Sequence, residues 1–177
     1  MIDYGALILV LVLTVAFCVP FVYMHQQKKQ HEKKLVGNFM SKSKELQLQI
    51  SSFDLWRRTY IIGVDPNQMK LLYMKFGEDE KVILLDLTHL KKVRIVDEKL
   101  EVGSGKEKEI IVTRLWLAFE DQNSNVRDTM LEFYNSDETH GLLGEPLLVK
   151  KWSNEVQTVL DKIARKAIKK EFKQKVI

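Results

Sequence analysis

The longest apolar run of this chain, residues 4–24, constrains its fold more than any other feature. It reads YGALILVLVLTVAFCVPFVYM, 21 residues with a tyrosine near each end. A helix of about 20 apolar residues is long enough to cross the hydrocarbon core of a bilayer, and tyrosine rings favour the membrane–water interface. The pattern therefore predicts a transmembrane anchor over residues 1–25.

A buried core helix and a cleaved signal peptide are the two alternatives to an anchor. A helix of a globular domain rarely stays apolar on every face over this length. A signal peptide begins with positive charge and ends at a small-residue cleavage site. Here Asp3 is the only charged side chain before the apolar run, and no such site follows it. Both alternatives are therefore less favoured than the anchor.

The residues that follow the apolar run predict an orientation. Four lysines come within ten residues of its end: Lys28, Lys29, Lys33 and Lys34. Lysine-rich flanks of a single-pass span stay on the cytoplasmic side. We therefore expect a plasma or inner membrane location with the N-terminus outside, the remaining chain in the cytoplasm, and these lysines close to the bilayer.

Charge is segregated along the chain. Residues 25–45 carry six lysines and two glutamates, and residues 150–177 carry eight lysines and one arginine against three acidic residues. The residues between them, 46–149, carry 13 basic and 18 acidic side chains. A nucleic-acid-binding domain usually has basic residues gathered on the domain itself, so we expect no nucleic-acid partner.

The basic C-terminal tail has two interpretations. It is either a solvated helix end, where cations also interact favourably with the helix dipole, or a contact for anionic lipid. The lysines that would make such a contact are Lys166, Lys169, Lys170 and Lys173.

Residues 26–55 are rich in lysine, glutamine, glutamate and leucine, which favour a helix. Their apolar residues approximate a stripe spaced by threes and fours, interrupted at Lys42 and Gln49. Three arrangements stay open for this stretch: a plain stalk, a helix packed on its own domain, or a coiled coil that makes a homo-oligomer.

Residues 56–177 predict one domain, in which the hydrophobic period changes to two. Strands are expected at 59–64, 69–76, 81–87, 90–96, 109–121 and 126–135, with turn-forming residues between them. The polar segment 98–109 is interpreted as a loop or hairpin tip. An amphipathic helix is expected over 147–172, with Trp152 on its apolar stripe. No helices separate the strands, so parallel βαβ units are excluded.

The predicted fold class is therefore α+β. It consists of a transmembrane helix followed by an antiparallel barrel or sandwich of six or seven strands, capped by a long C-terminal helix. This order resembles the pleckstrin-homology-like superfold, including its membrane-anchored bacterial members. The segments that carry the resemblance are VILLDLTHLKKVRIV (82–96), the pair RLWLAF and TMLEFYN within 114–135, and KKWSNEVQTVLDKI (150–163).

The resemblance covers residues 57–163 and implies that Trp152 packs into the barrel near the start of the terminal helix. It does not fix a function, because this superfold hosts lipid-binding, peptide-binding and scaffolding roles. Phosphoinositide-binding members carry basic residues around the first hairpin. The predicted hairpin tip here is Asp65-Pro66-Asn67-Gln68, which has no positive charge, and this departure disfavours specific inositol-phosphate binding.

Residues with catalytic or metal-binding potential are scattered. The chain has one cysteine, Cys18, so it cannot form an internal disulfide. None of the usual hydrolase or metalloprotease motifs is present, and the histidines lack ligand spacing. The histidines are His25, His31, His89 and His140. The sequence therefore predicts no cofactor, no metal and no enzyme activity.

The function predicted from sequence is a membrane-anchored, non-catalytic interaction or scaffolding module with a protein partner that the sequence does not name. Two alternatives are a small membrane-attached ligand sensor or enzyme that uses a pocket in the sheet, and nucleic-acid tethering through the basic tail. A close-set polar constellation in a pocket would favour the first alternative. Salt-dependent binding to DNA would favour the second.

Overall fold

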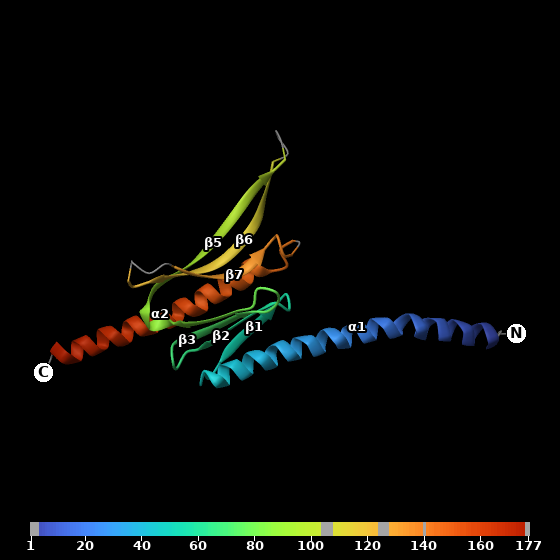
Figure 1. The fold of residues 1–177 in the computed structure, drawn as a ribbon, viewed down its shortest axis with the longest axis horizontal. Coiled ribbons are helices and arrows are strands. Elements are labelled where there is room, and N and C mark those ends of the chain that lie inside the picture. The colour runs from blue at the N-terminus through green and yellow to red at the C-terminus, as the bar shows by residue number, and fades with distance from the viewer. Residues whose placement is uncertain (1–3, 104–107, 124–127, 140, 176–177) are drawn as a thin grey trace.

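The computed structural model describes residues 4–103, 108–123, 128–139 and 141–175, and these form an α+β structure. Helix α1 (Tyr4–Glu45) precedes the strands and helix α2 (Glu145–Lys175) follows them (Figure 1). The seven strands are β1 (Ser52–Trp56), β2 (Tyr60–Asp65), β3 (Lys70–Lys75), β4 (Lys81–Asp86), β5 (Leu90–Val102), β6 (Glu109–Asp121) and β7 (Thr129–Asn135).

The strands form two antiparallel sheets. The first sheet has the order β1-β2-β3-β4 and the second sheet has the order β5-β6-β7, so every paired strand follows its neighbour in sequence. A short 3-10 helix, η1 (Leu87–His89), carries the chain from the first sheet to the second. Asp86 caps it by accepting the Thr88 N–H at 2.9 Å, and Leu87 is fully buried.

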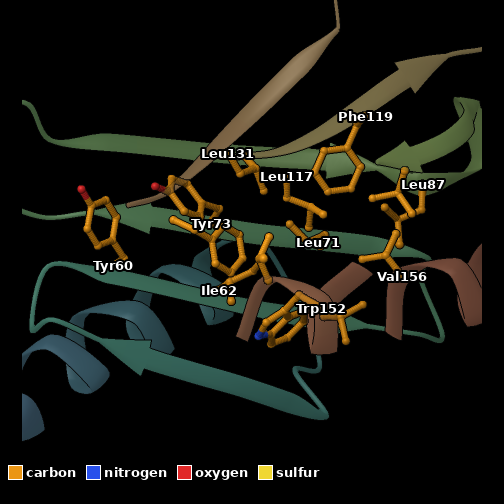
Figure 2. Packing of buried hydrophobic residues seen from close by; sticks show 14 of the residues in the cluster. Tyr60, Ile62, Leu71, Tyr73, Leu87, Leu117, Phe119, Leu131, Trp152 and Val156 are labelled. Atoms are coloured by element: carbon orange, nitrogen blue, oxygen red, sulfur yellow. The ribbon is translucent and has the colours of Figure 1, made fainter. Parts of the chain in front are cut away.

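The main hydrophobic core lies between the two sheets and α2, as Figure 2 shows. Trp152 is fully buried in it, near the start of α2, and its Nε1 donates to Asp54 at 2.8 Å. The other large side chains come from all three layers: Tyr60, Ile62, Leu71 and Tyr73 from the first sheet, Leu117, Phe119 and Leu131 from the second sheet, and Val156 from α2.

A second, smaller core lies on the outer face of the first sheet. The second half of α1 covers this face (Figure 1), and Phe39 is fully buried against Ile61 and Leu72. Gly63 makes this contact possible. A Cβ at that position would lie 2.8 Å from the Phe39 ring and 2.9 Å from the Ile50 side chain. Strands β2 and β3 are consequently buried on both faces.

The turn between β2 and β3 matches the one expected from its sequence and is organised by Asp65. This buried carboxylate accepts the backbone N–H of Gln49 at 2.7 Å, Asn67 at 2.9 Å and Gln68 at 3.0 Å. Burial raises the pKa of Asp65. The hydrogen bonds from these three N–H groups together lower it by more, so the pKa of Asp65 lies below its usual range. The linker after α1 is thereby fixed to the turn.

The prediction of a transmembrane anchor is wrong. Among the residues that the structure describes, none of the helices combines the length and the apolar character that crossing a membrane requires. Three predictions that depended on the anchor are therefore wrong as well. They are the transmembrane helix in the fold class, the description as a single-pass membrane protein, and the localisation in a membrane with a cytoplasmic domain. Residues 4–24 were predicted to form a separate element. In the structure they belong to one 42-residue helix, whose second half carries lysines and packs on a sheet.

Two further differences concern the strands. Residues 26–55 were predicted to be helical, but α1 ends at Glu45 and Ser52–Trp56 forms β1. Residues 98–109 were predicted to be a loop or hairpin tip, whereas strand structure extends into this segment, because β5 continues to Val102 and β6 begins at Glu109. In both cases the pairing with a neighbouring strand supplies backbone hydrogen bonds that outweigh local preference.

We predict that Gly63→Ala destabilises the protein by about 1–3 kcal/mol, because its Cβ overpacks the contact with Phe39. Gly37→Ala is the matched control. It lies in α1 with open space around its Cα, and alanine there should stabilise the helix by about 0.5–1 kcal/mol. Urea unfolding of both variants measures the difference, and equal responses would contradict the close approach of α1.

Candidate protein-interaction site

The turn between β1 and β2 places two arginines at its central positions. Arg57 and Arg58 have φ values of +50° and +51°, and the Thr59 N–H closes the turn on the Trp56 carbonyl at 3.2 Å. Successive positive φ values are typical of a type I′ turn, where asparagine and glycine are preferred. A residue of another type held at such a φ value lowers the stability of the fold by on the order of 1 kcal/mol or more.

Arg57 has a clear structural role. Its side chain is buried, forms an ion pair with Glu145, donates to the Gly141 carbonyl and lies 5.2 Å from the centre of the Tyr134 ring. Burial raises the pKa of Glu145. The hydrogen bond from Arg57 and the N–H donors, including that of Leu143, lower it to below the usual range. This contact fixes the first residue of α2 to the β1–β2 turn.

Arg58 points instead toward α1. Its Nε donates to Glu32 at 2.9 Å, and the two side chains are 44% and 43% exposed. An exposed ion pair contributes about 0–1 kcal/mol to stability. This contribution is no larger than the expected strain of the turn, so the contact with Glu32 does not by itself account for an arginine at this position.

A groove of about 440 Å³ opens beside this turn. We call it the arginine groove, and it is lined by Glu32, Leu55, Arg57, Arg58 and Leu143. It brings together α1, the β1–β2 hairpin and the loop before α2.

Two leucines, one before the start of α2 and one in its first turn, present exposed apolar surface. Leu143 is 81% exposed and Leu147 is 77% exposed, the highest values for large apolar side chains in the described part of the chain. Arginine next to exposed apolar side chains is typical of protein-interaction surfaces.

The lysines predicted to lie near a bilayer are all exposed on α1. Lys28 and Lys29 precede Glu32 by four and three residues, so they share its face of the helix. In α2, Lys166 is exposed, while the side chains of Lys169, Lys170 and Lys173 lie outside the described residues. The two chain ends lie at opposite ends of the molecule (Figure 1), so the structure does not bring the two lysine groups together.

A polar network lies at the end of β3. Lys75 donates to Glu132 at 2.8 Å and Glu138 at 2.6 Å, and the Tyr60 hydroxyl donates to Glu132 at 2.8 Å. Burial lowers the pKa of Lys75, but the two carboxylates raise it above the usual value. Burial and Glu132 raise the pKa of Tyr60. Lysine stays charged and tyrosine stays neutral, so neither is poised as a base.

The outer edge of β7 is covered by side chains of the first sheet. Trp56 Nε1 donates to the Phe133 carbonyl at 2.9 Å, and the Tyr73 hydroxyl donates to the Glu132 carbonyl at 2.8 Å. The rings of Trp56 and Phe133 stack at 4.7 Å. Because these carbonyls are already bonded, this part of the edge does not offer them to an added strand.

The outer end of the β5–β6 hairpin projects beyond the rest of the second sheet and away from the first sheet (Figure 1). We call its outer part, residues 95–102 and 109–112, the hairpin arm. Five of its aliphatic side chains are exposed: Ile95, Leu100, Val102, Ile110 and Ile111. The β6 side of the arm was predicted as a strand, but residues 98–102 were assigned to a loop or hairpin tip because charged residues alternate there with the aliphatic ones, although such alternation is itself a strand signal.

Within the described residues, no group of three or more histidine, cysteine, aspartate or glutamate side chains is placed to hold a metal ion. His31 and His89 are exposed and belong to different parts of the chain. His140 and the side chain of His25 lie outside the described residues.

No protein-family model, curated protein or solved structure matches this chain. The resemblance to the pleckstrin-homology-like superfold stays a prediction. The structure does relocate the first hairpin on which that comparison relied. Its turn is Arg57-Arg58, and Asp65-Pro66-Asn67-Gln68 belongs to the second hairpin.

We predict that Arg57→Met destabilises the protein by about 3–5 kcal/mol, because it leaves Glu145 buried without its partner. The double variant with Glu145→Gln should recover much of this loss. Urea unfolding at neutral pH measures both.

The same pair predicts a pH dependence. The pKa of Glu145 is lower in the folded state than in the unfolded state. The stability that Glu145 contributes is therefore fully present above its unfolded-state pKa of about 4.3, and it is lost as pH falls through the lower folded-state pKa. The stability difference between the wild type and Arg57→Met should therefore shrink in acid. A constant difference down to that range would contradict the ion pair.

Proposed function

We propose that this chain is a non-catalytic protein-interaction module. The hairpin arm is the observation that supports this proposal most strongly. Exposed apolar side chains that gather on one part of a protein and are bordered by polar residues mark interaction sites, and five such aliphatic side chains are exposed on the arm. Burying them against a partner is favourable by about 25 cal/mol for each Å² removed from water.

The geometry of the arm favours a protein as the partner. Leu100 lies opposite Ile111 in the β5–β6 register, and Glu101 lies opposite Ile110. Neighbouring residues of a strand point to opposite faces, so aliphatic side chains emerge on both faces of the arm. A two-stranded arm has no concave surface to enclose a small ligand, which such sites usually require, whereas a protein can pack against both faces.

The polar residues support a non-catalytic role. In the polar network at the end of β3, Lys75 is held by two carboxylates and the Tyr60 hydroxyl already donates to one of them. Their raised pKa values disfavour proton transfer near neutral pH. The network is better explained as the contact that joins β3 to β7.

Site-specific photo-crosslinking tests the proposal in cells that make the full chain. A photoreactive amino acid replaces Ile110, which is 63% exposed on the arm. The matched control places it at Lys162, an exposed position on α2. We expect ultraviolet light to give a discrete protein adduct from position 110 and none from position 162.

A second variant locates the contact. Leu100→Glu in the chain labelled at position 110 should abolish the adduct, because it adds a charge to the other face of the arm and a partner that packs against both faces loses that apolar contact. A change at an exposed position usually alters stability by less than about 0.5 kcal/mol, and the melting temperature checks this. The proposal fails if positions 110 and 162 give the same adducts, or if position 110 gives none.

A further inference from the structure

We infer that the arginine groove binds an acidic, leucine-containing segment of a partner protein, and that Arg58 then bonds a partner carboxylate in place of Glu32. This inference rests on the proposed interaction function. It concerns a surface separate from the hairpin arm and names the chemistry that the surface recognises.

The conformation of Arg58 is the first argument. Its φ of +51° suits glycine or asparagine, and its ion pair with Glu32 is exposed. Residues held in unfavourable backbone conformations gather at binding sites, where the side chain is required for another reason. An exposed guanidinium that offers paired N–H donors is well suited to bind a carboxylate.

Charge is the second argument. Of the five residues that line the groove, Glu32 is the only acidic one, and it is bonded to Arg58. Arg57 is already neutralised by Glu145. Lys28 and Lys29 stand on the same face of α1 as Glu32. If a ligand displaced Glu32, the groove would present an unpaired arginine beside two lysines, which complements an acidic segment.

Apolar surface is the third argument. Leu55 and Leu143 line the groove together with the arginines, and Leu147 follows Leu143 on the exposed surface. Leucine side chains of a bound segment can pack on these three while neighbouring carboxylates meet Arg58. Arginine is among the side chains that carry most binding energy at protein interfaces, and the apolar contacts around it exclude water.

The position of Glu32 makes the exchange easy. Helix α1 is held to the first sheet by Phe39, two helical turns further along, and by the partly buried Val36 and Met40 beside it. These side chains keep α1 in place whether or not Glu32 contacts Arg58. Glu32 therefore acts as a resident carboxylate that occupies the site weakly, and a partner carboxylate competes with it.

Fluorescence anisotropy with the full chain tests this inference. The probe is a fluorescein-labelled hexapeptide of alternating leucine and aspartate. Matched probes replace aspartate by asparagine or by lysine. We expect the aspartate peptide to bind most tightly, the lysine peptide not to bind, and the affinity for the aspartate peptide to fall as salt rises.

Substitutions then assign the contact. Arg58→Gln should weaken binding of the aspartate peptide by roughly tenfold, the size of one hydrogen bond between charged groups. Glu32→Gln should strengthen it by up to about fivefold, because the competing exposed ion pair is removed. Glu45→Gln is the matched control, since it breaks the exposed pair with Lys42 on the same helix, and it should leave the affinity unchanged.

Arg58→Gly separates binding from folding. Glycine fits the positive φ, so the melting temperature should not fall, while the aspartate peptide should bind as weakly as to Arg58→Gln. Equal binding of the three peptides, or unchanged affinity in both Arg58→Gln and Glu32→Gln, would overturn the inference. An adduct from position 110 would then still support the interaction function. Peptide binding without that adduct would overturn the proposal that the hairpin arm binds a protein, and would leave the inference about the arginine groove standing.

Discussion

The burial of β2 and β3 on both faces is the constraint on which the other features depend. Their inner faces contribute Tyr60, Ile62 and Tyr73 to the core beneath α2, and their outer faces receive α1. The outer contact exists because Gly63 leaves room for the ring of Phe39. Once α1 lies on the sheet, its direction places Glu32 beside the β1–β2 turn. The arginine groove is thus a consequence of how the helix docks.

Polar contacts close one end of the structure. The edge of β7 meets Trp56 and Tyr73 from the first sheet, and Lys75 joins Glu132 to Glu138 at the same end. Backbone carbonyls and charges that would otherwise be buried without partners are satisfied there. These contacts join the two sheets at β7, while β5 and β6 continue outward as the arm. The exposed aliphatic side chains of the arm therefore lie on a part of the second sheet that the first sheet does not cover.

The two arginines of the β1–β2 turn show how one local motif serves two purposes. Both residues have the same unfavourable backbone geometry. Arg57 turns toward α2 and is buried with Glu145, where losing it would leave a charge without a partner. Arg58 turns toward α1 and stays in water. Stability explains why an arginine is present at position 57. An arginine at position 58 is explained only if a partner binds its guanidinium.

Local patterns in the sequence determined much of this protein: most of the strands, the turn at Asp65, the terminal helix and the apolar stripe that contains Trp152. Each follows from a period of two or 3.6 residues or from turn chemistry acting over a few neighbours. The transmembrane prediction failed, because the apolar run was judged without the rest of α1. Tertiary structure alone decided the pairing of β1, the extent of the arm, and the approach of Glu32 to Arg58 and of Arg57 to Glu145. Those contacts join residues 26 and 88 positions apart, and no local pattern encodes them, since they form only when two sheets and two helices have packed.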